Sequence, residues 1–181
     1  MTGDDQHKQG KLEANNAFGA GAKSIVRQSP LAFRGNFDHT VDAKGRVSLP
    51  SEFRQILESQ KERSIVLTNY ISDGSRCLEG FSLSAWTEFE TKLRSKSRFS
   101  AKLQKLENFY LSRAAECSVD GAGRILIPNH LRIYAGLEKD ITFTSSIHGF
   151  RIWDSRVWEH IFNTAEEALM SNPDIFSDVD L

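Results

Sequence analysis

The sequence predicts an α+β fold made of two tandem copies of one small unit. The first observation is a motif, Val-Asp-x-x-Gly-Arg-x-x-x-Pro-x-x-x-Arg, which starts at Val41 and again at Val119, 78 residues later. The second observation is that each motif is followed by the same order of strand-like and helix-like patterns. Duplicated units of this kind bury their apolar faces against each other, so we expect the two copies to pack together.

The first unit begins near Phe33 with a turn between two short strands. Apolar and polar residues alternate over 37–41 and 47–49, which is the two-residue period of half-buried strands. Between them, Asp42 and Gly45 take the first and fourth positions of a tight turn, because Asp accepts hydrogen bonds from turn N–H groups and Gly tolerates a positive φ. We therefore predict a hairpin at this point.

The later elements of both units follow one order: a short helix opened by a proline, two strands, and a second helix. In the first unit we expect them at 51–58, 64–69, 77–81 and from Trp86 onward. In the second unit, strands at 117–119 and 125–127 flank a turn from Asp120 to Gly123. The elements expected after this turn are a helix opened by Pro128, strands at 141–144 and 150–153, and a helix from Arg156.

Residues 92–113 join the two units. Their apolar residues fall at helical spacing, so we expect a helical connector with one core-facing stripe, formed by Phe99, Leu103, Leu106 and Tyr110. The segment holds seven Lys or Arg residues and a single Glu. Our main interpretation is a solvated basic face, and the second is a supporting contact to phosphate.

These patterns divide the chain into five parts. Residues 1–32 show no sustained periodicity and are expected to form a disordered extension or leader. The remaining parts are the first unit at 33–83, the helical connector at 84–115, the second unit at 116–159, and a C-terminal helix with an acidic tail at 160–181.

Composition and charge exclude several classes of protein. No apolar run approaches the roughly 20 residues that span a bilayer, and the N-terminus lacks the apolar segment of a secretory signal. We therefore expect a cytoplasmic protein without a membrane partner. The net charge is −1, but residues 33–132 carry 16 basic against 12 acidic residues and residues 133–181 carry 3 against 9. The chain can thus present a basic face although it is nearly neutral overall.

The sequence offers no catalytic constellation, so we expect no enzyme activity, no cofactor and no small-molecule substrate. The five histidines form no His-Glu-x-x-His pair, and no Cys-x-x-Cys spacing provides a metal site. Two cysteines are too few for a disulfide framework.

The repeated turn is the one constellation with a binding mechanism. Arg46 and Arg124 leave their turns on the strand face opposite Val47 and Ile125, so they are expected to project outward. A two-stranded ribbon fits the DNA major groove, where Arg pairs bidentately with guanine. The alternative is that each Arg only forms a surface salt bridge with its own Asp, and residue chemistry alone favours this alternative.

Two runs carry a family resemblance: FRGNFDHTVDAKGRVSLPSEFR, at 33–54, and ECSVDGAGRILIP, at 116–128. In this order they resemble the two halves of the MraZ family of bacterial transcriptional regulators, over about residues 33–160. The resemblance implies two tandem AbrB-like swapped-hairpin half-units that form one pseudo-symmetric small β-barrel with flanking helices. It also implies nucleoid-associated, ring-like homo-oligomers that bind double-stranded DNA at short G-rich direct repeats upstream of the division and cell-wall gene cluster.

The resemblance places the family's Asp-x-x-Gly-Arg on both turns. It implies that four residues have a structural role there: Asp42, Gly45, Asp120 and Gly123. We expect the DNA contacts to come from Arg46, Lys44 and Arg124, with Lys44 mainly touching phosphate.

An antitoxin-like function remains as the alternative. AbrB-like folds also serve antitoxins, whose acidic C-terminal tails wrap a toxin. The tail at 171–181 is acidic and contains Ile175, Phe176 and Val179 as apolar anchors. Antitoxins, however, carry one unit per chain, and this chain carries two.

Overall fold

Eight strands form two antiparallel sheets in the part of the chain that the structure describes, residues 32–96, 100–172 and 174. In this computed structural model, the larger sheet has the strand order β1-β7-β8-β4-β3-β5, and β2 and β6 form the smaller sheet. The strands are β1 (Asn36–Thr40), β2 (Arg46–Ser48), β3 (Ser64–Ser72), β4 (Ser75–Ser82), β5 (Ala115–Ser118), β6 (Arg124–Leu126), β7 (Asp140–Ser145) and β8 (Phe150–Asp154). The predicted α+β class is confirmed.

Helices flank these sheets, and all except the third lie at the positions that the repeat predicts. They are α1 (Ser51–Ser59), α2 (Leu83–Arg94), α3 (Ala101–Phe109), α4 (Asn129–Ala135) and α5 (Ser155–Ser171), with one 3₁₀ turn at Leu111–Arg113. None of the helices in these residues is long and apolar enough to cross a membrane. The extension expected at 1–32 lies, up to residue 31, outside the described residues.

The strand pairing interleaves the two units. β1 of the first unit pairs with β7 of the second, and β5 of the second unit pairs with β3 of the first. These two pairings are equivalent under the internal repeat. Phe37 lies opposite Phe143 in the first pairing, and Ala115, which corresponds to Phe37, lies opposite Leu67 in the second. The larger sheet ends at β1 and β5, which are not paired with each other in the described strands.

The prediction of a simple hairpin at Asp42–Gly45 was wrong about the partners of its strands. The turn itself forms, since the Asp42 N–H donates to the Arg46 carbonyl at 2.8 Å. Its two strands then separate: β1 joins β7 in the larger sheet, and β2 joins β6 in the smaller one. A turn sequence determines where the chain reverses, whereas the burial of each strand's apolar side determines its partner.

The main core lies between the two sheets. Phe53 of α1 is fully buried, and its ring lies 5.0 Å from that of Phe33 and 5.2 Å from that of Phe150. The smaller sheet contributes Val47 and Ile125, each only 1% exposed. One core therefore holds both units and both sheets together.

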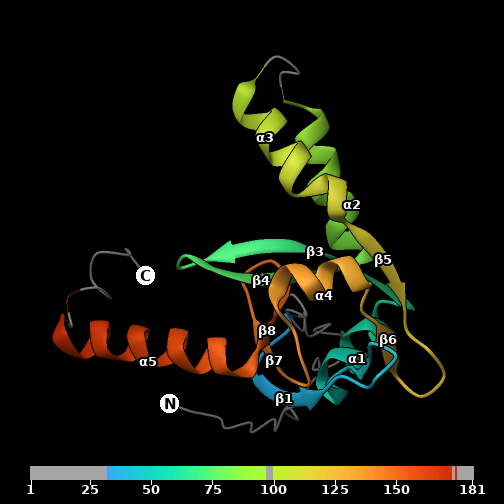
Figure 1. Ribbon diagram of the computed structural model, residues 1–181. Coiled ribbons are helices and arrows are strands. Elements are labelled where there is room, and N and C mark those ends of the chain that lie inside the picture. The colour runs from blue at the N-terminus through green and yellow to red at the C-terminus, as the bar shows by residue number, and fades with distance from the viewer. Residues whose placement is uncertain (1–31, 97–99, 173, 175–181) are drawn as a thin grey trace, which may run out of the picture.

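Helices α2 and α3 form an arm that extends away from the sheets (Figure 1). The single helical connector expected at 92–113 is therefore two helices, because α2 continues to Arg94 and a new helix begins after the Ser100 cap. Leu103 and Leu106 of the expected stripe are half-buried and Tyr110 is buried, while Phe99 lies outside the described residues.

Candidate nucleic-acid interface

Asp42 organises the first turn. Its Oδ1 accepts hydrogen bonds from the backbone N–H groups of Lys44 and Arg46, both at 2.9 Å. Gly45 has a φ of 85°, which L side chains rarely adopt. The hydrogen bond from the Arg46 backbone, followed by that from its side chain, lowers the pKa of Asp42 to about 2. The carboxylate is therefore ionised at neutral pH and keeps the turn closed.

Asp120 organises the second turn in the same way. Its Oδ1 accepts from the N–H groups of Ala122 and Arg124, again at 2.9 Å. Gly123 has a φ of 75° and donates its N–H to the Asp120 carbonyl at 2.9 Å. The backbone hydrogen bond from Arg124 is the main cause that lowers the pKa of Asp120.

Each arginine also pairs with the aspartate of its own turn. The Nε and Nη2 atoms of Arg46 both lie 2.8 Å from Asp42 Oδ2. In the second turn, the Nε and Nη2 atoms of Arg124 lie 2.9 and 2.8 Å from Asp120 Oδ2. The salt bridges that we weighed as the alternative to a DNA contact are thus present. Because the arginine side chains are 36% and 37% exposed, these pairs add little to stability, but they fix the direction of each guanidinium.

Strand pairing brings the two arginines onto one ribbon. In the β2–β6 pair, Arg46 lies opposite Leu126 and Ser48 lies opposite Arg124. All four side chains are on the outer face, since the intervening Val47 and Ile125 point into the core. Arginines that are 78 residues apart in sequence therefore share one accessible two-stranded surface.

The two ends of this ribbon differ. Lys44 is exposed at the first turn, and Ala122 occupies the corresponding place in the second turn. The first end therefore carries one more cation than the second.

Two further arginines lie against the turns, and sequence reasoning assigned them no role. A Cβ at Gly45 would lie 2.8 Å from the Cζ of Arg132, and a Cβ at Gly123 would lie 2.5 Å from Nη1 of Arg54. Each of these arginines belongs to the unit opposite its turn: Arg54 is on α1 and Arg132 is on α4. The available signal was their position as the last residue of both copies of the motif.

These supporting arginines are only partly satisfied by the protein. Arg132 donates from Nε to the Ile127 carbonyl at 3.3 Å and from Nη2 to Asn129 Oδ1 at 3.2 Å. The Nε of Arg54 is buried and has no hydrogen-bond partner among the described residues. Four arginines thus lie around one ribbon, and because the aspartates of the turns pair with only two of them, this group keeps a net positive charge that suits a phosphate backbone.

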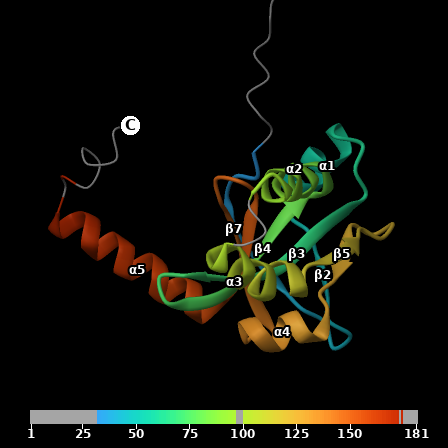
Figure 2. The same ribbon diagram turned by 90° about the horizontal axis from the view of Figure 1, so that it is seen from above.

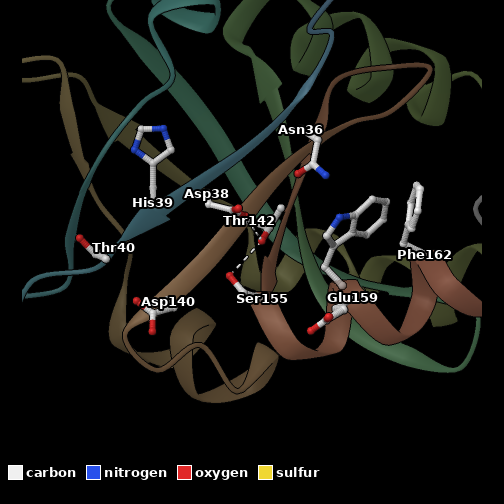
Figure 3. Close-up of a pocket in the computed structure, with 10 residues that line it drawn as sticks. Asn36, Asp38, His39, Thr40, Asp140, Thr142, Ser155, Glu159 and Phe162 are labelled. Atoms are coloured by element: carbon white, nitrogen blue, oxygen red, sulfur yellow. Dashed lines mark hydrogen bonds between the residues drawn. The ribbon is translucent and has the colours of Figure 1, made fainter.

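A cavity of about 810 Å³ between β1 and the base of α5 offers a different kind of site (Figure 3). Thr142 Oγ1 donates to Asp38 Oδ1 at 2.8 Å and lies 2.9 Å from Ser155 Oγ. His39 points away from this chain, and its ring packs against Phe143 of the core. His39 therefore does not lie beside the Thr142 or Ser155 hydroxyl as a base. Nor do the described residues contain a group of three or more His, Cys, Asp or Glu side chains that could hold a metal.

Comparison with known proteins gives the same family twice in this chain. The family model described as "MraZ protein, putative antitoxin-like" matches residues 32–109 and 110–175. The transcriptional regulator MraZ of Acetivibrio thermocellus is 41% identical over 127 residues, which cover 70% of this chain and 84% of the relative. That of Pseudomonas savastanoi pv. phaseolicola is 32% identical over 146 residues, which cover 81% of this chain and 95% of the relative. The chain therefore belongs to the MraZ family.

Proposed function

We propose that this protein is a sequence-specific DNA-binding transcriptional regulator that reads short G-rich direct repeats with the β2–β6 ribbon. The observation that carries the proposal is the outward pair Arg46 and Arg124 on one ribbon face, each oriented by an ionised aspartate. Such a ribbon fits the major groove, and Arg pairs bidentately with guanine there. The relatives compared above are named transcriptional regulators, which supports this class of function.

Within this proposal the residues have three roles. Arg46 and Arg124 read bases, and Lys44 binds phosphate. Asp42, Gly45, Asp120 and Gly123 hold the turns in shape. Arg54 and Arg132 support the turns from the opposite units and add positive charge beside the DNA backbone.

Self-association completes the proposal. The chain forms a ring-like homo-oligomer, so several ribbons engage successive repeats and weak contacts gain effective concentration. Each subunit is one small pseudo-symmetric barrel of half-units 33–83 and 116–159, flanked by the connector at 84–115 and the segment 160–181. The regulator is cytoplasmic and nucleoid-associated, and it acts upstream of the division and cell-wall gene cluster.

Arginine substitution tests the proposal directly. Arg46→Ala should abolish specific binding to a G-repeat duplex, and Arg124→Ala should weaken it less, because the first end of the ribbon carries the extra cation. The loss of a bidentate Arg–guanine contact is worth roughly tenfold to a hundredfold in affinity per site. The measurement is a titration of G-repeat and scrambled duplexes, with circular dichroism to check folding. If Arg46→Ala binds the G-repeat duplex as well as wild type, the turn is only structural.

Lys44→Ala should weaken G-repeat and scrambled duplexes by similar factors. A phosphate contact also contributes to the salt dependence, so the slope of log K against log salt should fall by about one per bound site. The matched variant is Ala122→Lys, which should steepen the slope by restoring the missing cation at the second turn. An unchanged slope in both variants would remove Lys44 from the interface.

The family description also contains the words "antitoxin-like", so the competing function is that of an antitoxin that binds a protein partner. The same substitution tests it. If Arg46→Ala has no effect on DNA binding, and the protein instead isolates with one stoichiometric protein partner without DNA, that function replaces the regulator.

A further inference from the structure

We infer that helix α5 of one copy docks into a groove of a second copy, between the α2–α3 arm and the β3–β4 hairpin. This inference rests on the self-association proposed above but not on the reading of DNA. It names the surfaces through which the copies meet.

The receiving groove is a hollow of about 670 Å³ with mainly aromatic and aliphatic walls. Phe81, Phe89, Leu106, Phe109 and Tyr110 contribute to these walls. At its edge stand Ile71 and Ile147, whose side chains are 50% and 94% exposed. A groove of this kind suits the apolar stripe of an amphipathic helix.

Helix α5 has the matching shape. It runs for 17 residues, contains no buried residue, and projects away from the sheets in both views (Figures 1 and 2). Its apolar residues recur at a spacing of three or four, which places them on one side: Trp158, Ile161, Phe162, Ala165 and Leu169. Phe162, on this side of the helix, is 50% exposed.

In the internal repeat, helix α2 of the first unit corresponds to helix α5 of the second. Trp86 of α2 and Trp158 of α5 each follow an aromatic residue of the preceding strand by five positions. The apolar side of α2 is covered by α3 and the turn after it, with the Trp86 ring 5.9 Å from that of Tyr110. Helix α5, in contrast, packs mainly on β7 and β8 among the described elements. Trp158, at the base of the stripe, packs on Trp153 of β8 with the ring centroids 5.8 Å apart, so the outer part of the stripe, from Ile161 to Leu169, is available to a second copy.

The apolar and charged residues of the two surfaces complement each other. Seven large hydrophobic residues are exposed in the described residues, and three of them lie on these two surfaces: Ile71, Ile147 and Phe162. The arm has six basic and three acidic residues over 83–96 and 100–113, whereas α5 has one basic and three acidic. Opposite net charges attract α5 to the arm, whereas two α5 helices would repel each other.

A complementation experiment tests this docking. The α5 variant carries Phe162→Asp, and the groove variant carries Ile71→Asp and Ile147→Asp. Alone, each should lose assembly in native mass spectrometry, with dissociation constants raised roughly thirtyfold or more. A 1:1 mixture should form a heterodimer and no larger species, because it combines one intact helix with one intact groove. The control Ile133→Asp, at a 72% exposed residue of α4, should assemble like wild type.

Each other result overturns the inference in a distinct way. If the groove variant assembles normally and the α5 variant does not, α5 binds another partner surface, such as a second α5. If both variants assemble normally, neither surface is used. A monomeric wild type would remove self-association altogether, whereas intact assembly without DNA binding would remove only the proposed regulator function. All three substituted residues are at least half exposed, and circular dichroism verifies that the variants fold.

Discussion

In each turn, a single carboxylate holds both the backbone and the arginine side chain in position. Asp42 uses Oδ1 for two backbone N–H groups and Oδ2 for the Arg46 guanidinium, and Asp120 does the same for Arg124. The arginine side chain and the turn that presents it are therefore positioned by one residue. An arginine held in this way loses less side-chain entropy when it binds a ligand.

Gly45→Ala should destabilise the protein by about 1–2 kcal/mol, because a Cβ meets both a positive φ and the side chain of Arg132. The matched control is Gly121→Ala in the second turn, where a Cβ has no heavy atom within 4 Å. Urea unfolding of both variants gives the comparison. Equal stability of the two would show that the glycine at position 45 is not required for the turn.

At the scale of elements, strands β4 and β8 pair the two units, and this pair contains a buried carboxyl group. Glu79 lies opposite Arg151 in this pair and is only 7% exposed. The Tyr110 hydroxyl donates to Glu79, which connects the arm to the sheet. Burial raises the pKa of the Glu79 carboxyl, the hydrogen bond from Tyr110 opposing this. Ionisation of the Glu79 carboxyl therefore costs more free energy in the folded protein than in the unfolded chain.

The Glu79→Gln variant should gain stability relative to wild type as the pH rises from 4 to 8. A carboxyl whose pKa is raised by folding makes its full contribution to the free energy of unfolding below its unfolded pKa. This contribution is lost as the pH rises through the folded pKa. Glutamine stays neutral throughout and can still accept from Tyr110. Thermal unfolding of both proteins across this range measures the difference.

Glu88→Gln is the control for this pH dependence. The hydrogen bond from Lys92 lowers the pKa of Glu88, so its contribution has the opposite sign: it is present above the unfolded pKa and lost as the pH falls. Because Glu88 is exposed, the effect should be small. A melting-temperature difference between Glu79→Gln and wild type that stays constant with pH would contradict the buried-carboxyl interpretation.

Local chemistry predicted the elements and the turns but not the partners of the strands. Asp42 and Gly45 determine a chain reversal within a few residues, and the alternation around Val47 determines which side is buried. The pairing of β1 with β7 depends on residues about a hundred positions away, and no local signal encodes it. The break between α2 and α3 was missed because the apolar spacing of 92–113 continues through it.

The candidate site was predictable to a similar extent. The alternation indicated that Arg46 and Arg124 face outward, and the structure adds that they share one ribbon. The packing of Arg54 against Gly123 could not be predicted, because it joins opposite units through a contact that depends on their interleaving.

At the scale of the whole molecule, both units depend on one aromatic core. Phe33 is 5% exposed, and its ring lies 5.0 Å from that of Phe53 and 5.1 Å from that of Phe150. It is the first residue along the described chain that belongs to this core. Phe33 therefore ties the start of the first unit to residues of both units.

Deletion of residues 1–31 should leave stability, assembly and DNA binding nearly unchanged, since their sequence has no pattern that demands burial. A deletion through Phe33 is the matched comparison and should cost about 3 kcal/mol or more, as for other buried phenylalanines. Calorimetry and native mass spectrometry of the two truncated proteins separate these outcomes. A large loss from the shorter deletion would show that the segment is structural.

The exchange of strands between units also has a consequence for synthesis on the ribosome. β1 and β2 emerge first, but β6 follows β2 by about 80 residues and β7 follows β1 by about a hundred. Until then, the nascent first unit exposes strand edges and the apolar side of Val47 to the cytosol. Nearly the whole chain must be translated before the core can close, and such non-local pairing makes folding slow and leaves the growing chain dependent on protection from aggregation.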